Sequence, residues 1–383
     1  MVYLDNSATT APSEAVKRAV TEALECFGNP SSLHSLGFEA QKKLDAARAA
    51  VMTALGAKNG RIVFTSCGSE ANNMAIIGSA IAKARRTATR VLTTDCEHPS
   101  VDNAIRELEK MGFETVRIPT RGGVLDMAAL DRALEKPVFL ASFMLVNNEV
   151  GSYFDVKEVF SMIKAAYPDA ICHCDAVQGF LKVKFTPASI GADLVSISGH
   201  KIHALKGIGA LWVSDAMIRA KKIVPIIVGG GQESGYRSGT ENTVGIAALA
   251  AAAKEGSDSF SADAEKMRGL REYAISLISE KCPEIKLNLP RRAAPHVLSI
   301  TLPSIKSETM LHYLSAKGIC VSSGSACSSH SQKASATLLA FGLDPKAADC
   351  TLRVSLCRYN EKEDIEALAA ALQSGLAELI RIK

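Results

Sequence analysis

The stretch Ser198-Gly199-His200-Lys201 places a lysine between two predicted strands. Residues 193–197 alternate polar and apolar side chains, and residues 207–213 form a largely apolar run, so each pattern predicts a strand. A lysine held in a desolvated cleft has a lowered pKa and can form a Schiff base with an aldehyde, whereas a solvated lysine remains an ammonium ion. Lys201 is therefore a candidate nucleophilic amine, and a solvated surface lysine is the alternative.

A candidate thiol lies in residues 322–331, which read Ser-Ser-Gly-Ser-Ala-Cys-Ser-Ser-His-Ser. Small polar residues are typical of an exposed, mobile loop, where the thiolate of Cys327 can act as a nucleophile. An incidental exposed cysteine is the alternative. We interpret His330 in the same loop as a solvated side chain.

Other polar residues with chemical potential follow predicted strands. Gly68 and Ser69 open a helix whose free N–H groups can bind a phosphate, although Ser69 is also an ordinary N-cap. Asp175 can pair with a protonated ring nitrogen or cap a helix. His98 can stack on a flat cofactor or relay protons, or it can be structural. Arg353 can hold a carboxylate through its two-pronged guanidinium.

Three further features lie near these positions. The amide of Asn148 follows the longest apolar strand and can point into the same cleft. Glu70 lies close to the predicted phosphate site, and the sequence gives no reason for an acid there. Cys172 and Cys174 share one face of a strand with His173 opposite, which favours a buried structural role over a metal site. We therefore expect no bound metal.

The elements that must position these residues alternate between strand and helix from residue 61 onward. Strands are predicted at residues 62–65, 91–94, 115–118, 138–146, 171–175 and 194–197. Helices are predicted at residues 69–84, 100–111, 127–134 and 156–167. This alternation predicts an α/β fold whose mostly parallel sheet is flanked by helices, with ligands at the carboxyl ends of the strands. Residues 223–228, before a glycine run, are predicted to form one more strand.

The chain is predicted to contain two domains and a joining segment. Residues 1–14 are expected to join the small domain, residues 15–257 to form the large cofactor-binding domain, and residues 258–383 to form a smaller α+β domain that carries the mobile loop of Cys327. The boundary is set by the polar stretch 256–263, which is predicted to have little regular structure. A long helix is expected to follow it.

Composition limits the classes of function. The 383 residues are 47% hydrophobic, which is ample for a large core, and the net charge of +4 is not clustered, which argues against direct nucleic acid binding. Asp5 interrupts any amino-terminal signal peptide, and the longest apolar run, residues 244–253, is too short to cross a membrane. Ten irregularly spaced cysteines indicate reduced thiols. We expect a soluble cytoplasmic protein.

Taken together, these stretches resemble the cysteine desulfurases of the NifS/IscS type, in the class V aminotransferase group of fold type I pyridoxal-phosphate enzymes. The matching motifs include Phe-Gly-Asn-Pro-Ser-Ser at 27–32, Asp-Ala-Val-Gln at 175–178 and Ser-Gly-His-Lys at 198–201. Further matches run in family order at residues 3–10, 64–73, 96–98, 146–151, 237–242 and 322–327. The sequence departs from the family at three places. Ala204 and Leu205 follow His203 where the family usually has Gly-Pro. Cys67 stands in place of a common glycine, and Ser69 in place of a common threonine.

The resemblance implies that Lys201 holds pyridoxal 5'-phosphate covalently. Its phosphate would be bound by Gly68, Ser69, Ser198 and His200, together with Thr240 from the second subunit of a homodimer. Asp175 would pair with the pyridine nitrogen, and His98 would stack on the ring. Gln178 and Asn148 would contact the side of the phenolic oxygen.

The resemblance also implies a reaction, the conversion of L-cysteine to L-alanine. Arg353, with help from Asn148, would bind the substrate carboxylate, His98 would carry a proton, and Cys327 would accept sulfur as a persulfide. The sulfur would pass to an IscU/NifU-like scaffold for iron–sulfur cluster assembly or to a tRNA-thiolation enzyme. A selenocysteine lyase or another β-eliminating enzyme of the same fold is the first alternative, and a low-turnover sulfur-relay protein is the second.

Overall fold

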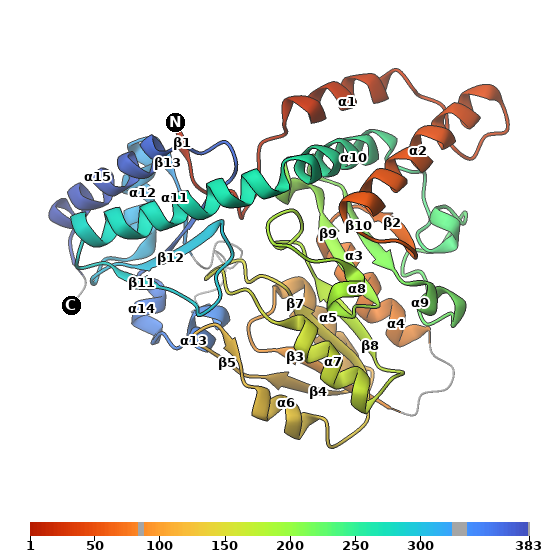
Figure 1. Cartoon of the computed structure of the whole chain (residues 1–383), viewed down its shortest axis with the longest axis horizontal. Helices are drawn as coiled ribbons and strands as arrows, with labels where there is room; N and C mark the ends of the chain where they lie inside the picture. Colours follow the sequence, from red (N-terminus) through yellow and green to blue (C-terminus); the bar gives the residue numbers. More distant parts are fainter. Residues whose placement is uncertain (83–87, 324–334, 382–383) are drawn as a thin grey trace.

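The computed structural model describes residues 1–82, 88–323 and 335–381 (Figure 1). Cys327 and His330 lie outside these ranges. The roles of Cys327 as sulfur acceptor and of His330 as a solvated side chain therefore remain predictions.

A seven-stranded sheet forms the centre of the larger part of the molecule. Its order is β2 (Arg61–Thr65), β10 (Gly209–Val213), β9 (Leu194–Ser198), β8 (Ile171–Asp175), β7 (Val138–Met144), β3 (Arg90–Thr94) and β4 (Glu114–Ile118). β10 runs antiparallel to both of its neighbours, and the other neighbouring pairs are parallel. The predicted mostly parallel sheet is confirmed.

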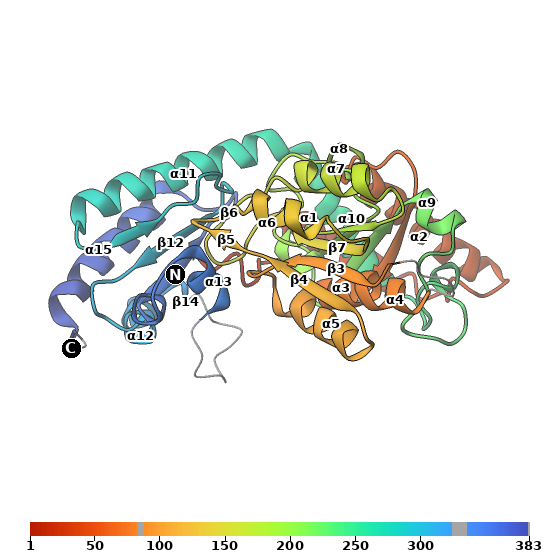
Figure 2. The ribbon, with the colours of Figure 1, turned by 90° about the horizontal axis from the view of Figure 1, so that it is seen from below.

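Helices cover both faces of this sheet, as the alternating pattern predicts (Figures 1 and 2). One face packs against α2 (Ser35–Ala54), α6 (Met127–Ala133), α7 (Val156–Ala166) and α10 (Thr243–Asp258). The other face packs against α3 (Gly68–Asn73), α5 (Pro99–Lys110) and α9 (Asp215–Arg219). Helix α1 (Glu14–Leu24) lies against α10.

Shorter elements complete this part of the chain. The helix predicted for residues 69–84 consists of α3, a π-helical turn η1 (Met74–Gly78) and α4 (Ser79–Ile81). The other short elements are β5 (Thr120–Arg121), β6 (Val124–Leu125), α8 (Pro187–Ile190), η2 (Gly199–Lys201) and η3 (Glu233–Gly235).

A second sheet of four antiparallel strands forms a separate core. Its order is β11 (Lys286–Asn288), β12 (Val297–Thr301), β15 (Thr351–Ser355) and β14 (Ser322–Ser323). The helices of this part are α11 (Phe260–Lys281), α12 (Ser307–Ala316), α13 (Ala336–Phe341), α14 (Pro345–Asp349) and α15 (Lys362–Glu378). Leu4 belongs to the same core, and β1 (Val2–Tyr3) pairs in parallel with β13 (Ile319–Cys320).

Two predictions about secondary structure are wrong. Residues 223–228 form no strand, because Val224 N–H bonds to Gly78 O and the carbonyl of Ile227 accepts from Ser238 N–H. Residues 256–263 are almost entirely helical, since α10 runs to Asp258 and α11 begins at Phe260. Their polar character comes from an exposed helix surface, not from a linker. The domain boundary at residues 257/258 stays a prediction.

Candidate active site

Four predicted site residues follow neighbouring parallel strands. Met144 pairs with Asp175, and Asp175 pairs with Ser196, so β7, β8 and β9 end at one edge of the sheet. His98, Asn148, Gln178 and Lys201 come within a few residues of the ends of β3, β7, β8 and β9. The pattern of strand ends that the sequence analysis used therefore does bring polar residues to one edge.

The predicted phosphate site is formed where β2, β10 and β9 meet. Gly209, the first residue of β10, pairs with both Thr65 and Ser198, so the helix start at Gly68 lies beside Ser198. A Cβ at Gly68 would lie 3.3 Å from Ser198 Cβ and 2.8 Å from Val177 Cγ2. The buried Ser198 Oγ has no hydrogen-bond partner among the described residues. Gly68 therefore packs closely against Ser198 and Val177, and this contact brings the Ser198 hydroxyl beside the first N–H groups of α3.

His200 borders this space and is linked to the amino-terminal segment. Its Nδ1 lies 3.3 Å from Thr9 Oγ1, and its backbone carbonyl accepts from Thr10 N–H at 2.8 Å. Burial lowers the pKa of His200 to about 4, with further lowering by Lys201 and Lys206. The imidazole is therefore neutral at physiological pH, and it can donate a hydrogen bond to an anion without carrying charge.

The amine of Lys201 is directed toward the amino-terminal segment. Lys201 Nζ donates to the carbonyls of Ser7 at 2.6 Å and Ala8 at 2.9 Å. Gln178 Nε2 donates to the same Ser7 carbonyl at 2.9 Å. The structure therefore brings together two residues that the family resemblance assigns to the same cofactor.

A chain of hydrogen bonds links His98 to Asp175. His98 Nδ1 lies 2.8 Å from Ser100 Oγ, and Asn72 Nδ2 lies 2.9 Å from Ser100 Oγ and 2.8 Å from Asp175 Oδ2. Because Asn72 Nδ2 and Ser100 N–H both donate, the Ser100 hydroxyl donates to His98 Nδ1, and the neutral ring carries its hydrogen on Nε2. Asn72 and Ser100 are positioning residues that the sequence analysis did not single out.

The ionisation of this chain follows from burial. Burial lowers the pKa of His98; Asp175 opposes the effect and Lys201 adds to it, so His98 is a neutral proton acceptor. Asp175 is 6% exposed and also accepts from Val177 N–H at 2.9 Å. Donors on both carboxylate oxygens fix the orientation of this side chain, and a carboxylate is a suitable partner for a protonated ring nitrogen.

Arg353 lies where β15 meets the amino-terminal segment and the loop after β7. Its Nη2 donates to Asp5 Oδ1 at 2.8 Å, and its Nη1 donates to the carbonyl of Asn148 at 3.0 Å. The side chain is only 5% exposed, and its Nε has no hydrogen-bond partner among the described residues. Arg353 and Asn148 are thus neighbours, and the guanidinium already binds one carboxylate.

Two predicted site residues are not joined to this group. Thr240 is exposed and makes no hydrogen bond within the described part of the chain. Cys327 lies outside the described ranges. The other predicted residues are linked in smaller groups. Lys201 joins Gln178 through Ser7, and His98 joins Asp175 through Ser100 and Asn72. Gly68 lies against Ser198, Arg353 bonds the Asn148 backbone, and Ser69 is exposed.

These residues fit pyridoxal phosphate by three criteria. The Ser198 Oγ, which has no partner among the described residues, and the helix start at Gly68 match a phosphate, and the buried Asp175 carboxylate matches a pyridinium nitrogen. The charges of Lys201 and Asp175 both act on the pKa of His98, so the amine and the carboxylate each lie near this ring. A covalent link to an aldehyde is consistent with this placement.

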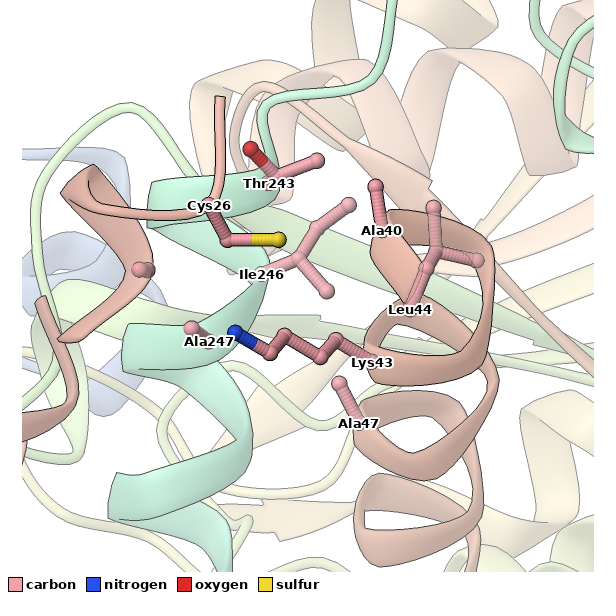
Figure 3. Close-up of a pocket in the computed structure, with 9 residues that line it drawn as sticks. Cys26, Ala40, Lys43, Leu44, Ala47, Thr243, Ile246 and Ala247 are labelled. Atoms are coloured by element: carbon pink, nitrogen blue, oxygen red, sulfur yellow. The ribbon is translucent and has the colours of Figure 1, made fainter. Parts of the chain in front are cut away.

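A small cavity lies away from these residues, between α1, α2 and α10. Cys26 and Lys43 point into it from opposite sides, and apolar side chains such as Ile246 form its wall (Figure 3). None of the predicted site residues lines it. In the described ranges, no group of three or more His, Cys, Asp or Glu residues is arranged to hold a metal ion. No helix in these ranges is long and apolar enough to span a bilayer.

Comparison with known proteins agrees with the fold and the site. The aminotransferase class-V family matches residues 2–368, which is nearly the whole chain, and the chain therefore belongs to this family. Within this family, the chain belongs with the cysteine desulfurases of the NifS/IscS type, to which it is similar over nearly its whole length.

Three relatives illustrate the similarity. Cysteine desulfurase IscS 1 of Archaeoglobus fulgidus is 36% identical, and the match covers 100% of this chain and 98% of the relative. The solved structure of a NifS-like protein superposes with a TM-score of 0.91 at 32% identity and covers 99% of this chain and 100% of that chain. The structure described as SspA in complex with cysteine has a TM-score of 0.77 at 29% identity and covers 94% and 100%.

Proposed function

We propose that this chain removes sulfur from L-cysteine, releases L-alanine and keeps the sulfur on Cys327 as a persulfide. The convergence of Lys201, Asp175 and His98 at one sheet edge, in a chain of the cysteine desulfurase group, carries this conclusion. Pyridoxal phosphate, when bound, supplies an aldehyde for amines and a ring that accepts electrons from the substrate Cα. Lys201 would hold it, Gly68, Ser69, Ser198 and His200 would bind its phosphate, and Asp175 would pair with its ring nitrogen.

The substrate carboxylate is proposed to bind at Arg353. The contact with Asp5 at 2.8 Å supports this role, because it demonstrates a guanidinium in position to hold a carboxylate. The unpaired Nε–H offers one more donor to the incoming group. The nearby Asn148 is proposed to contribute its amide to the same carboxylate.

Two residues are proposed to move protons. Lys201 Nζ would receive the proton from the substrate Cα once the amine is free of the cofactor, since it lies within reach of the same region. His98 is bonded to Ser100 through Nδ1, which leaves Nε2 as the ring nitrogen that is proposed to exchange a proton with the substrate.

Sulfur transfer is proposed to occur at Cys327. Its thiolate attacks the sulfur of the substrate, an S–S bond forms and the substrate C–S bond breaks. Cysteine and one enzyme thiol give alanine and one enzyme persulfide, so atoms and electrons balance without an added oxidant. The persulfide is then proposed to pass to an IscU/NifU-like scaffold or to a tRNA-thiolation enzyme.

We further propose a homodimer in the cytoplasm. Phe27, Leu33 and Phe38 are 82%, 88% and 61% exposed around the joint between α1 and α2, which is more exposed apolar surface than an isolated subunit usually leaves. Thr240, the residue proposed to reach the partner subunit, is also exposed. The nine described cysteines are all free, which supports a reducing compartment.

The experiment is to incubate the purified protein with pyridoxal phosphate and L-cysteine, to quantify alanine, and to analyse the Cys327 peptide by mass spectrometry. We expect alanine and a peptide heavier by one sulfur atom. Cys327→Ser should lose both products while it retains the visible absorbance of the bound cofactor, and Lys201→Ala should lose that absorbance.

Alanine formation that survives in Cys327→Ser would contradict the persulfide mechanism. Pyruvate, ammonia and sulfide in place of alanine would favour β-elimination, and a keto acid that keeps its sulfur would favour transamination. Much faster turnover of selenocysteine without a persulfide would favour a selenocysteine lyase. A wild-type protein that binds the cofactor but forms no alanine would favour the relay alternative.

A further inference from the structure

An ion pair joins the predicted phosphate-binding turn to the segment 229–240. Glu70, the third residue of α3, accepts from Arg237 Nε at 3.0 Å through Oε1. Its other oxygen, Oε2, accepts from the backbone N–H of Ser66 at 2.8 Å. One carboxylate therefore closes the turn of residues 66–69 and binds a segment that lies more than 150 residues later in the chain.

This ion pair is largely shielded from water. The Glu70 side chain is 9% exposed and the Arg237 side chain 24%. Burial by itself would raise the pKa of Glu70, but the hydrogen bonds from Arg237 and Ser66 outweigh it and hold the pKa below its usual value. Glu70 is thus ionised at neutral pH, although it stands beside a turn that is predicted to bind a phosphate.

The segment has a second anchor, on the strand that precedes the 66–69 turn. Arg48 of α2 binds Glu233 through two hydrogen bonds, of 2.7 and 2.9 Å, and Glu233 Oε2 also accepts from Phe64 N–H at 3.0 Å. Phe64 belongs to β2, the strand that leads directly into the 66–69 turn. The segment is therefore fixed at two points, on β2 and on α3.

Backbone strain between the anchors indicates that the segment is held in one conformation. Glu233 and Ser234 have φ angles of +51° and +57°, which residues with a side chain rarely adopt. Such strain persists only where surrounding contacts impose it. The buried ion pairs of Glu233 and Arg237 supply those contacts, and Thr240 follows only three residues after Arg237.

We propose that Glu70 and Arg237 are positioning residues that fix the phosphate-binding turn of one subunit and the segment carrying Thr240 as a single unit. The inference rests on the proposed function, because it assumes a cofactor phosphate at this turn and a partner subunit that receives Thr240. Its consequence is that cofactor binding and subunit association are coupled through this ion pair. By thermodynamic linkage, subunit association then strengthens cofactor binding by the same factor by which the cofactor strengthens association.

Two roles for Glu70 predict opposite results. If Glu70 acted only through its charge, Glu70→Gln would remove repulsion and would bind the cofactor phosphate more tightly. If Glu70 positions the turn, the same substitution weakens binding, because the ion pair with Arg237 is lost. Arg237→Gln weakens binding under both roles, so Glu70→Gln is the informative variant.

The test measures cofactor affinity by equilibrium dialysis with pyridoxal phosphate in four proteins: wild type, Glu70→Gln, Arg237→Gln and the double variant. We expect each single variant to bind about tenfold more weakly and the double variant to be no weaker than either single one, since the two residues act as a pair. Arg90→Gln is the control, because Arg90 forms an ion pair with Glu114 at the first residues of β3 and β4, whereas the site lies beyond the carboxyl ends of the strands.

The second readout is the dimer dissociation constant from sedimentation, with and without saturating pyridoxal phosphate. We expect the cofactor to strengthen the wild-type dimer severalfold and to have no such effect in Glu70→Gln or Arg237→Gln. Thermal unfolding verifies that each variant folds. Arg237→Lys keeps the positive charge and is used in place of a variant that fails to fold. We expect it to restore part of the cofactor affinity that Arg237→Gln loses.

Unchanged or tighter cofactor binding in Glu70→Gln overturns the inference, and so does a coupling that persists in the variants. Failure of the wild-type protein to bind the cofactor is a different result, since it overturns the proposed function. The two failures are therefore distinguishable.

Discussion

At the scale of single residues, Asn72 holds two site residues in place at once. Its Nδ2 bonds both Asp175 and Ser100, and Ser100 in turn bonds His98. The amide is 1% exposed, so water cannot replace it when it is removed. Two groups with different chemical roles therefore depend on one side chain that touches neither substrate nor cofactor.

We expect Asn72→Ala to destabilise the protein by about 1–3 kcal/mol, because it leaves a buried carboxylate without one donor. We also expect cofactor affinity to fall about tenfold, as Asp175 loses its orientation. Urea unfolding and equilibrium dialysis measure the two effects.

Asn288 provides the matched control for Asn72. It is equally buried in the second core and bonds Ser299 and Thr301 through its own Nδ2. Asn288→Ala should lose similar stability and keep normal cofactor affinity. Equal loss of affinity in both variants would contradict a positioning role for Asn72.

Glu97 predicts a pH dependence of stability. It accepts hydrogen bonds from Thr94 Oγ1 at 2.8 Å and Met144 N–H at 3.0 Å, and burial raises its pKa to about 8 from an ordinary value of 4.5. Between these pH values the native state holds a proton that the unfolded state has lost. The free energy of unfolding therefore falls as pH rises through the window, by at most about 1.4 kcal/mol per pH unit for this group.

Glu97→Gln removes the titrating carboxyl group. It should therefore flatten the pH dependence of the free energy of unfolding between about pH 4.5 and 8. Urea unfolding of wild type and variant across the range measures the difference between the two curves, in which the other titrating groups cancel. Parallel curves would show that Glu97 ionises normally in the folded protein.

Residue patterns predicted some of the site but not all of it. Lys201, Asp175 and His98 follow strands, so the strand pattern alone places them at one edge. Asn72 lies inside a helix, where an amide has no distinguishing spacing. The pKa of Glu97 is raised by burial beside Thr94 and Met144, which donate hydrogen bonds to its carboxylate. No local sequence pattern predicts this environment.

At the scale of elements, the π-helical turn η1 ends against the segment that was expected to be a strand. A Cβ at Gly78, the last residue of η1, would lie 2.6 Å from the Val224 carbonyl oxygen. Val224 N–H also bonds the Gly78 carbonyl at 3.2 Å. Gly78 is therefore the point where helix and segment come into closest contact.

We expect Gly78→Ala to destabilise the protein by about 1–3 kcal/mol, because the new methyl group meets rigid backbone. Gly269→Ala in α11 is the control. A Cβ there has no neighbour within 4 Å, so the substitution should stabilise the protein by about 0.5–1 kcal/mol. Thermal unfolding compares the two, and equal shifts would contradict the close contact.

The elements that were predicted wrongly share one cause. Apolar residues at 223–228 fit a strand, yet they pack on a helix and bond Gly78 and Ser238. Polar residues at 256–263 fit a linker, yet ion pairs such as Arg358 with Glu255 and Asp263 support a helix there. In both places distant parts of the chain decided the structure.

At the scale of the whole molecule, exposed apolar side chains predict self-association. Leu33 is 88% exposed at the joint between α1 and α2, so Leu33→Asp should raise the dimer dissociation constant at least about tenfold by placing a charge in the interface. Sedimentation velocity measures the change. Leu289→Asp, on a 46% exposed leucine near β11, should leave the dimer intact.

The overall architecture was the most predictable level. The alternation of strands and helices specifies a layered sheet, since a parallel sheet needs helices on both faces. The packing of Leu4 into the second core supports the proposal that residues 1–14 join the small domain. No periodic pattern could predict the contacts of residues 5–10, because they are made with residues almost 200 to 350 positions away.

Those contacts have a consequence for synthesis on the ribosome. The carbonyls of Ser7 and Ala8 that receive Lys201 belong to a segment whose neighbours include Cys320 and Ser355. Residues 4–8 can therefore dock only after residues 320 and 355 have been synthesised. A nascent chain arrested before residue 319 should lack the surroundings that hold the lysine, and we expect it to bind no vitamin B6.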